Sequence, residues 1–314
     1  MGAVNPAPPT PGLVHTESCG VDTPTTSTEA VGHTGHMSTY SRETLLTGLA
    51  FPEGPRWQNG ALWFSDIYAG QVHRFDPVAG TDEIVAEIAG GPSGLGFLPD
   101  GRLLIANGAD KTVYVRGHDG ALTAHADLSE VATWTVNDMV VDNQGRAYVG
   151  NYGDDSAPPA PPRPSALALV DVDGTVSVAA TEMMFPNGMV LTKDRGTLIV
   201  AETRATPGRL TAFSIAADGT LSDRRTLIEF GPTVFPDGIA IDDEDGVWVA
   251  SPFDGAVIRV DQAGEITERI EVPGAFAVAI DTAAPALYVT ASADWVPEKA
   301  LADRTGRIDR IALG

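Results

Sequence analysis

The amino-acid sequence predicts an all-β fold, a six-bladed β-propeller whose blades are four-stranded antiparallel sheets. The first observation behind this prediction is an internal repeat: a tight turn followed by two short apolar strands recurs with lead residues Asn137, Asn187 and Asp237, at intervals of 50 residues. The second is the pattern between these points, where short alternating strands are separated by glycine turns and no convincing helical periodicity extends over three turns. Four short strands in a repeat of roughly 40–50 residues are typical of propeller blades.

The composition limits the classes of function. The 314 residues carry a net charge of −22, which argues against nucleic acid or an anionic membrane as a partner. The same charge is compatible with cation binding, or simply with solubility. A single cysteine allows no intramolecular disulfide. No apolar run of about 18 residues occurs, so no transmembrane helix is predicted. We expect a small-molecule substrate as the partner.

Residues 1–38 differ in composition from the rest of the chain. They are rich in Pro, Thr, Ser and Gly and show no apolar periodicity, which predicts a disordered N-terminal extension. No basic segment precedes an apolar one, so no secretory signal is indicated and a cytoplasmic location is expected. The propeller domain is predicted to occupy residues 39–314.

The first five units are expected to be meanders of short strands. In unit one we expect an apolar run from 44 to 46, a turn at 51–57, and strands at 61–66, 70–76 and 83–88. Unit two begins at 93–97, turns at 99–101 and continues at 103–106. Units three, four and five begin near Asn137, Asn187 and Asp237.

The sixth unit indicates how the ring closes. It contains strands at 276–281, 286–290 and 306–311, but no clear fourth strand follows. We expect the segment Tyr40–Leu46 to supply that strand, because pairing of the first and last segments closes the ring and removes a free sheet edge.

Polar residues at equivalent positions of four units form the predicted site. The first strand of each propeller blade lines the central channel, so residues at the turn before that strand converge on the axis. Glu53, Asn137, Asn187 and Asp237 hold this position in units one, three, four and five. Asn and Asp before Gly are also common turn formers, but no turn requires a glutamate. Two carboxylates and two amides are oxygen donors that suit Ca²⁺, Mg²⁺ or Mn²⁺.

The same residues carry a resemblance to a known family. The segments 52–57, 137–138, 186–188 and 236–238 resemble motifs of the regucalcin/gluconolactonase family of six-bladed propellers, which includes senescence marker protein-like and luciferin-regenerating proteins. The resemblance implies one divalent metal at the axis, held by Glu53, Asn187 and Asp237, with Asn137 contacting the metal, the substrate or both. It makes Ca²⁺ the first expectation, with Mn²⁺, Zn²⁺ or Mg²⁺ as alternatives.

One position departs from the family pattern. Gluconolactonase-type members often carry Arg two residues before the Asn-Asp pair, where it helps to hold a sugar acid, and this chain has Thr135 there. A less polar lactone or an ester is therefore an alternative to a sugar lactone. Trp134, Phe185 and Phe253 lie beside the channel turns, so we expect them to form a substrate-binding wall with Thr135 and Asn137. Ordinary packing between blades is the alternative for each aromatic residue.

The predicted function is metal-dependent hydrolysis of a lactone. A divalent ion would polarise the lactone carbonyl and stabilise the developing oxyanion. Asp237 would act as general base toward water, or as the nucleophile itself. An organophosphate or ester hydrolase on the same site is one alternative, and a non-catalytic ligand-binding propeller is another. The sequence contains no Gly-x-Ser-x-Gly motif, which argues against a Ser-His-Asp hydrolase.

Overall fold

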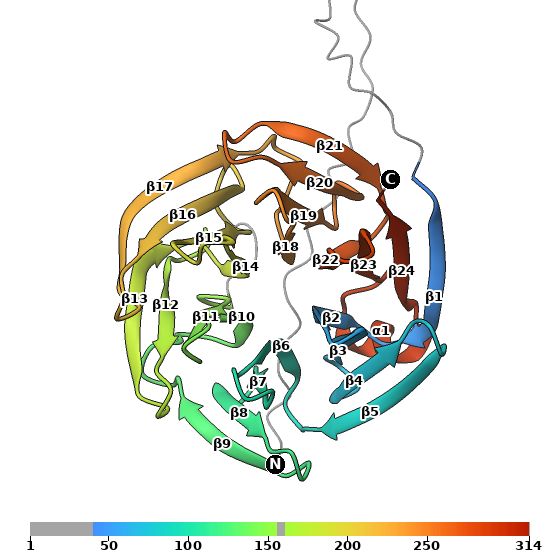
Figure 1. Cartoon of the computed structure of the whole chain (residues 1–314), viewed down its shortest axis with the longest axis horizontal. Coiled ribbons are helices and arrows are strands. Elements are labelled where there is room, and N and C mark those ends of the chain that lie inside the picture. Colours follow the sequence, from blue (N-terminus) through green and yellow to red (C-terminus); the bar gives the residue numbers. More distant parts are fainter. Residues whose placement is uncertain (1–39, 156–160, 314) are drawn as a thin grey trace, which may run out of the picture.

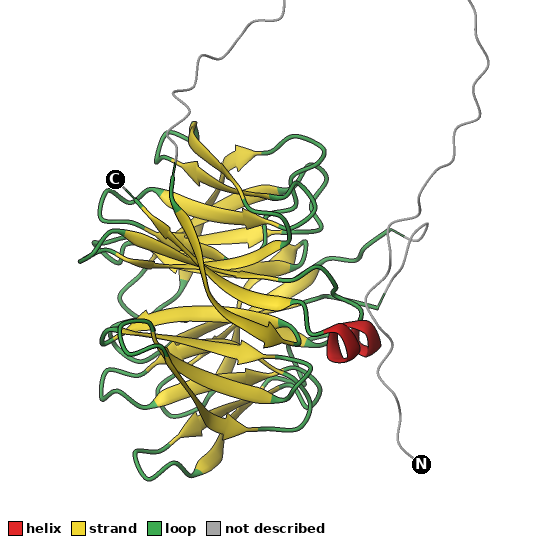
Figure 2. Cartoon of the chain, turned by 90° about the vertical axis from the view of Figure 1, so that its right-hand side faces the viewer, coloured by secondary structure: helices red, strands yellow, loops and turns green. Residues whose placement is uncertain are grey.

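Six antiparallel sheets surround a central axis in the computed structural model of this chain (Figure 1). The structure describes residues 40–155 and 161–313, so the predicted disorder of residues 1–38 lies outside the described residues. The sheets form a disc, with the short helix α1 (Pro297–Asp303) on one face (Figure 2). No helix in these ranges has the length and apolar character of a membrane span. The predicted six-bladed β-propeller is confirmed, and the cytoplasmic location stays a prediction.

Blades one to five each consist of four strands that are consecutive both in the sequence and in the sheet. The first strand of each blade is innermost and the last is outermost (Figure 1). The strands are β2 (Pro52–Gln58), β3 (Ala61–Asp66), β4 (Gln71–Asp76) and β5 (Thr81–Glu87) in blade one; β6 (Pro92–Phe97), β7 (Leu103–Asn107), β8 (Thr112–Arg116) and β9 (Leu122–Asp127) in blade two; β10 (Val136–Val141), β11 (Ala147–Asn151), β12 (Ser165–Val170) and β13 (Val176–Met183) in blade three; β14 (Pro186–Leu191), β15 (Thr197–Glu202), β16 (Arg209–Ile215) and β17 (Leu221–Glu229) in blade four; and β18 (Ile239–Ile241), β19 (Val247–Ser251), β20 (Ala256–Val260) and β21 (Ile266–Glu271) in blade five.

Blade six combines both ends of the described chain. It contains β22 (Ala275–Asp281), β23 (Ala286–Ala291) and β24 (Gly306–Ala312), with β1 (Arg42–Leu49) as the outermost strand. β1 pairs antiparallel with β24, and the Thr44 hydroxyl donates a 2.6 Å hydrogen bond to the Asp309 carboxylate. The predicted closure by the segment Tyr40–Leu46 is confirmed, and the strand extends to Leu49.

The prediction for the start of blade one was wrong. Residues 51–57 were expected to form a turn because they contain two prolines and a glycine, but Pro52–Gln58 forms the strand β2. As the innermost strand, β2 has a sheet neighbour on one side only. A strand at the edge of a sheet tolerates residues without an N–H group, because the ladder needs only one side of its backbone.

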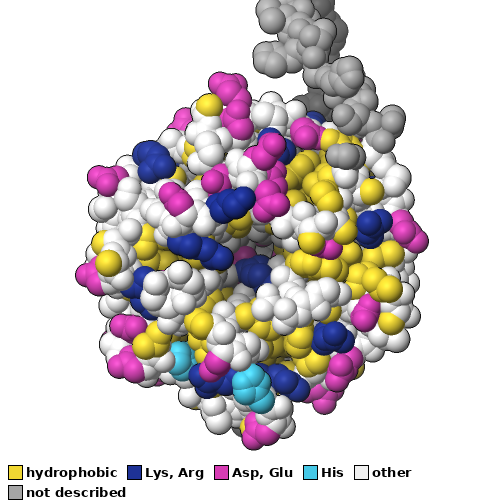
Figure 3. Space-filling model, in the orientation of Figure 1, with side chains coloured by type: hydrophobic (Ala, Val, Ile, Leu, Met, Phe, Trp, Pro, Cys, Tyr) yellow, Lys and Arg dark blue, Asp and Glu magenta, His cyan; other side chains and the backbone are white. Residues whose placement is uncertain are grey.

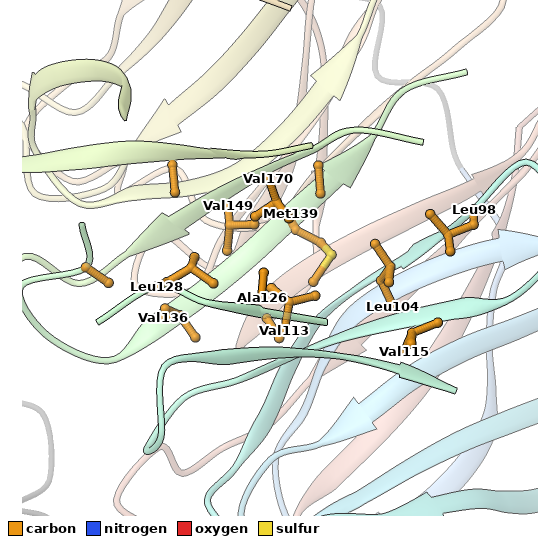
Figure 4. Packing of buried hydrophobic residues seen from close by; sticks show 14 residues of the cluster. Leu98, Leu104, Val113, Val115, Ala126, Leu128, Val136, Met139, Val149 and Val170 are labelled. Atoms are coloured by element: carbon orange, nitrogen blue, oxygen red, sulfur yellow. The ribbon is translucent and has the colours of Figure 1, made fainter. Parts of the chain in front are cut away.

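Apolar side chains pack in the spaces between neighbouring blades. One cluster combines Leu104 and Val113 of blade two with Met139 and Val149 of blade three, all of them fully buried (Figure 4). Each such side chain stabilises the fold by roughly 1.5–3 kcal/mol relative to an exposed position. Packing of this kind fixes the inner strands relative to one another, and with them the residues at the axis.

Candidate functional site

The innermost strands bulge where the predicted site residues lie. In blades one, three and four, the pairing of the innermost strand with its neighbour shifts register near its first residues. Glu53, Asn137 and Asn187 lie in these segments, and Asp237 comes two residues before β18. A bulge disrupts the ladder locally and redirects a side chain. The repeated bulge therefore gives polar side chains of several blades a common direction.

Two glycines let neighbouring blades approach at these bulges. A Cβ atom at Gly54 would lie 2.4 Å from the Ser93 carbonyl oxygen, and one at Gly188 would lie 2.5 Å from that of Asp237. The Gly188 N–H donates a 3.2 Å hydrogen bond to the Asp237 carbonyl. Direct backbone contact between blades thus sets the spacing of the site residues.

The structure brings the four predicted axial residues together. The Asn137 amide nitrogen Nδ2 donates to Asn187 Oδ1 over 2.6 Å, and Asn187 Nδ2 donates to Asp237 Oδ1 over 2.5 Å. Glu53 lies close enough for its ionisation to depend on the charge of Asp237. One carboxylate, two amides and a second carboxylate therefore meet from four different blades.

Both carboxyl groups of this set hold their protons more strongly than exposed ones. Burial raises the pKa of Glu53 well above its ordinary value, and the negative charge of Asp237 raises it further. Burial also raises the pKa of Asp237 to about 8, although the hydrogen bond from Asn187 opposes the rise. Two carboxylates in one enclosed site disfavour each other's ionisation, and a divalent cation between them would relieve that repulsion.

The donor set determines which residues could hold a metal. Over residues 40–155 and 161–313, no group of three or more His, Cys, Asp or Glu side chains is arranged to hold a metal ion. A cation at the axis would therefore need the amide oxygens of Asn137 and Asn187 as well as the two carboxylates. Such an all-oxygen set fits a hard cation such as Ca²⁺.

Arg56 of β2 connects the inner strands of blades one and three. Its Nη2 donates to Asp138 Oδ1 over 2.6 Å and to the Met139 carbonyl oxygen. On the face opposite α1, a basic side chain lies at the bottom of the central hollow (Figure 3). The ion pair holds Asp138 beside the axial set, where its negative charge adds to the rise in the pKa of both Glu53 and Asp237.

A cavity of about 320 Å³ adjoins the axial residues on the α1 side. Its wall combines aromatic, aliphatic and polar residues, and Pro297 and Leu301 of α1 contribute to it. The lining side chains include those of Phe51, Tyr68, Trp134, Asn137, Tyr152 and Arg204. Asn137 belongs both to the hydrogen-bonded axial set and to the cavity wall, so the cavity reaches the site.

The five predicted substrate-binding residues divide into two groups. Trp134, Thr135 and Asn137 line the cavity. Phe185 is buried and does not line the cavity itself, but its ring stacks on that of the lining residue Tyr152 with centroids 4.2 Å apart. Phe253 is 48% exposed and packs edge-on against the Trp295 ring instead of lining the cavity. Contact of Phe185 and Phe253 with a substrate stays a prediction.

Three cavity residues that were not predicted from the sequence follow the second strand of a blade. Tyr68 comes shortly after β3, Tyr152 directly after β11 and Arg204 two residues after β15, and all three line the cavity. They differ in residue type and in their distance from the end of the second strand, so the repeat in the sequence does not single them out. Burial raises the pKa of both tyrosines, which keeps their hydroxyl groups protonated as hydrogen-bond donors at neutral pH.

The fold and the site define a class of protein: a six-bladed propeller with an oxygen-donor set on its axis and a cavity of small-molecule size beside it. The chain belongs to the SMP-30/gluconolactonase/LRE-like family, whose profile matches residues 51–293. The resemblance noted in the sequence is thereby confirmed.

Three comparisons illustrate this relationship. Pentonolactonase XacC of Haloferax volcanii is 30% identical over 253 residues, which cover 78% of this chain and 82% of that protein. The structure of a gluconolactonase from Xanthomonas campestris matches with a TM-score of 0.71 at 22% identity, covering 88% of this chain and 90% of that one. Regucalcin from Agrobacterium tumefaciens, a calcium-binding protein, matches with a TM-score of 0.71 at 23% identity, covering 87% and 95%. The two structures share the fold with this chain.

Proposed function

We propose that this protein hydrolyses lactones and uses one divalent cation, held by Glu53, Asn137, Asn187 and Asp237. The observation that carries the proposal is the convergence of two carboxylates and two amides beside a cavity. The relative named as a pentonolactonase supports a lactone as the substrate. The calcium-binding regucalcin of the same fold makes Ca²⁺ the first ion to test.

The residues of the site would divide the chemistry between them. When bound, a divalent cation supplies a Lewis acid that polarises a carbonyl group and stabilises negative charge on its oxygen. Asp237 would accept a proton from water as the water attacks the carbonyl carbon, and the ring C–O bond then breaks to give the hydroxy acid. Alternatively, the Asp237 carboxylate would attack the carbonyl carbon itself, the ring C–O bond would break, and water would hydrolyse the resulting acyl-enzyme. Tyr152 keeps its proton and donates a hydrogen bond to the substrate. The Tyr68 hydroxyl donates its hydrogen bond to the Trp295 carbonyl oxygen over 2.7 Å, and the aromatic side chains of the cavity wall limit the access of bulk water.

Hydrolysis by the metal-stripped protein tests this proposal. We expect no turnover of glucono-1,5-lactone or of five-carbon aldonolactones without metal, and recovery when Ca²⁺, Mn²⁺, Zn²⁺ or Mg²⁺ is added singly. Glu53→Gln and Asp237→Asn each remove one negative charge from the site and should lower metal affinity and kcat/KM by roughly 100-fold or more. Glu83→Gln and Asp243→Asn make the same chemical changes at exposed positions and should leave both quantities unchanged.

Calorimetric titration with the metal separates the parts of the proposal. Metal binding without turnover of any lactone would contradict the lactonase and direct the search to phosphotriesters and other esters. A wild-type protein that binds no divalent metal would contradict the metal site and favour a non-catalytic ligand-binding propeller. Full turnover by metal-loaded Asp237→Asn would remove Asp237 from both catalytic roles.

A further inference from the structure

We infer that Arg204 determines substrate specificity, by donating hydrogen bonds to the hydroxyl groups of a lactone ring that carries no charge. This inference deepens the proposed function and rests on its placing the substrate in the cavity beside Asn137. It assigns a role to a residue outside the axial set.

Contacts on two sides hold the Arg204 guanidinium at the cavity wall. Its Nη1 donates to the Asp154 carboxylate over 3.1 Å and to the Asp154 carbonyl oxygen over 3.3 Å. Its central carbon lies 5.8 Å from the centre of the Phe185 ring, which itself stacks on Tyr152. A guanidinium held in this way is ordered before a ligand arrives, so less side-chain entropy is lost on binding.

Part of the guanidinium is free to face a ligand. An arginine side chain has five N–H donors, and among the described residues only Nη1 of Arg204 donates hydrogen bonds. The side chain is 19% exposed and belongs to the cavity wall. Donors on Nε and Nη2 therefore remain for a molecule in the cavity.

The ion pair decides which polar groups of a ligand fit. Asp154 is buried and pairs with both Arg204 and the exposed Arg163, and the Asp155 carboxylate also lines the cavity. Two carboxylates thus accompany two guanidinium groups, so the wall offers donors with little net positive charge. A carboxylate or sulfonate on the ligand would gain little from this pair and would be repelled by a chain of net charge −22. A neutral hydroxyl group on the ligand needs only a hydrogen-bond donor, and the Arg204 guanidinium supplies one from Nε or Nη2.

Arg204 also changes the expectation based on Thr135. An arginine is missing at position 135, which predicted a less polar lactone, but Arg204 brings a guanidinium to the same cavity from blade four. The cavity therefore keeps a polar element, and a hydroxylated ring suits it better than an apolar one.

Kinetics of Arg204→Met on three lactones test the inference. The substrates are D-glucono-1,4-lactone, the carboxylate-bearing D-glucaro-1,4-lactone, and γ-valerolactone, which has no hydroxyl group. We expect the wild type to prefer the first. Arg204→Met should raise KM for it by roughly ten- to a hundredfold, the range of a hydrogen bond to a charged group, with kcat within about twofold. KM for γ-valerolactone should not change. Arg225→Met, on the exposed outer strand of the same blade, is the matched control.

A binding measurement keeps the inference testable even if no lactone is hydrolysed. 1,5-Anhydro-D-glucitol has the hydroxylated ring without the carbonyl, and its binding can be followed by the fluorescence of Trp134, which lines the cavity. Binding by the wild type and loss in Arg204→Met, with an unchanged melting temperature, would support Arg204 independently of catalysis. An equal rise of KM for all three lactones, a preference for the anionic one, or undiminished polyol binding by Arg204→Met would overturn the inference.

Discussion

Thr203 contributes to the orientation of the Asn187 amide. Its Oγ1 donates to the Pro236 carbonyl oxygen over 2.7 Å, so it acts as an acceptor for Asn187 Nδ2, 3.0 Å away. With the amide nitrogen facing Thr203, Oδ1 lies on the other side of the amide, where it meets Asn137. The Thr203 hydroxyl and the Asp237 carboxylate both accept from Nδ2, and together they select which end of the Asn187 amide faces Asn137.

Removal of that hydroxyl should weaken metal binding. Thr203→Val keeps the shape of the side chain but not the acceptor, so we expect metal affinity to fall by roughly 10- to 100-fold, the usual effect of losing a group that orients a ligand. Thr203→Ser keeps the hydroxyl and should bind metal within a few-fold of the wild type. Calorimetry measures both. Equal affinities of Thr203→Val and the wild type would show that the amide is oriented by other contacts.

At the scale of the element, the end of β15 is anchored by a buried carboxylate. Glu202 is fully buried and accepts two 2.9 Å hydrogen bonds from Arg209 and a 2.8 Å hydrogen bond from the Met184 N–H. Glu202 directly precedes Thr203 and Arg204. The anchor thus fixes the loop that supplies two of the residues on which the site depends.

The charge of Glu202 should stabilise the protein at neutral pH. Burial raises the pKa of this group, but the hydrogen bonds from Arg209 and Thr211 outweigh burial and hold the pKa below its ordinary value of 4.5. A carboxyl group with a lowered pKa in the folded state adds stability above pH 4.5, and this contribution is lost as the pH falls through the folded-state pKa. We expect Glu202→Gln to lower the free energy of unfolding by roughly 1–3 kcal/mol at pH 7.

Urea unfolding of the wild type and Glu202→Gln between pH 7 and pH 3 checks this prediction. The difference between the two proteins should be constant near neutrality and shrink below pH 4.5. A difference that does not depend on pH would mean that the variant acts through packing and not through the charge.

For the whole molecule, the pairing of β1 with β24 closes the ring. β1 contributes the outer strand of blade six, and all other blades are built from consecutive strands. Without β1, the outer edge of β24 would expose unpaired N–H and C=O groups.

Deletion of residues 1–47 should therefore disrupt the propeller, because it removes most of β1. We expect a lower melting temperature, a broader transition and concentration-dependent association through the exposed β24 edge. Deletion of residues 1–39 leaves β1 in place and serves as the control. Calorimetry and size-exclusion chromatography measure the outcome, and identical melting curves for the two truncations would contradict a closing role for β1.

The sequence predicted the repeated parts of this structure better than its irregular parts. Glu53, Asn137, Asn187 and Asp237 could be identified because the repeat places them at equivalent positions, and the structure brings them together. Arg204 could not be identified in this way, because it lies in the loop after β15. Burial imposes an alternation of apolar and polar residues on a strand, but it imposes no such pattern on a loop. The strand β2 was mistaken for a turn because it contains two prolines. A strand tolerates these prolines when it lies at the edge of a sheet, and the edge position of β2 beside the axis follows from the arrangement of the whole ring.

Closure by the first strand has a consequence for biosynthesis. Thr44 and its partner Asp309 are separated by 265 residues, so β1 leaves the ribosome long before β24 exists. At a translation rate of roughly 5–20 residues per second, this interval is on the order of half a minute. During that time the ring formed by blades one to five stays open, and β1 lacks its partner strand β24. The yield of this protein in a cell should therefore depend on how nascent chains are shielded by chaperones as much as on the stability of the finished ring.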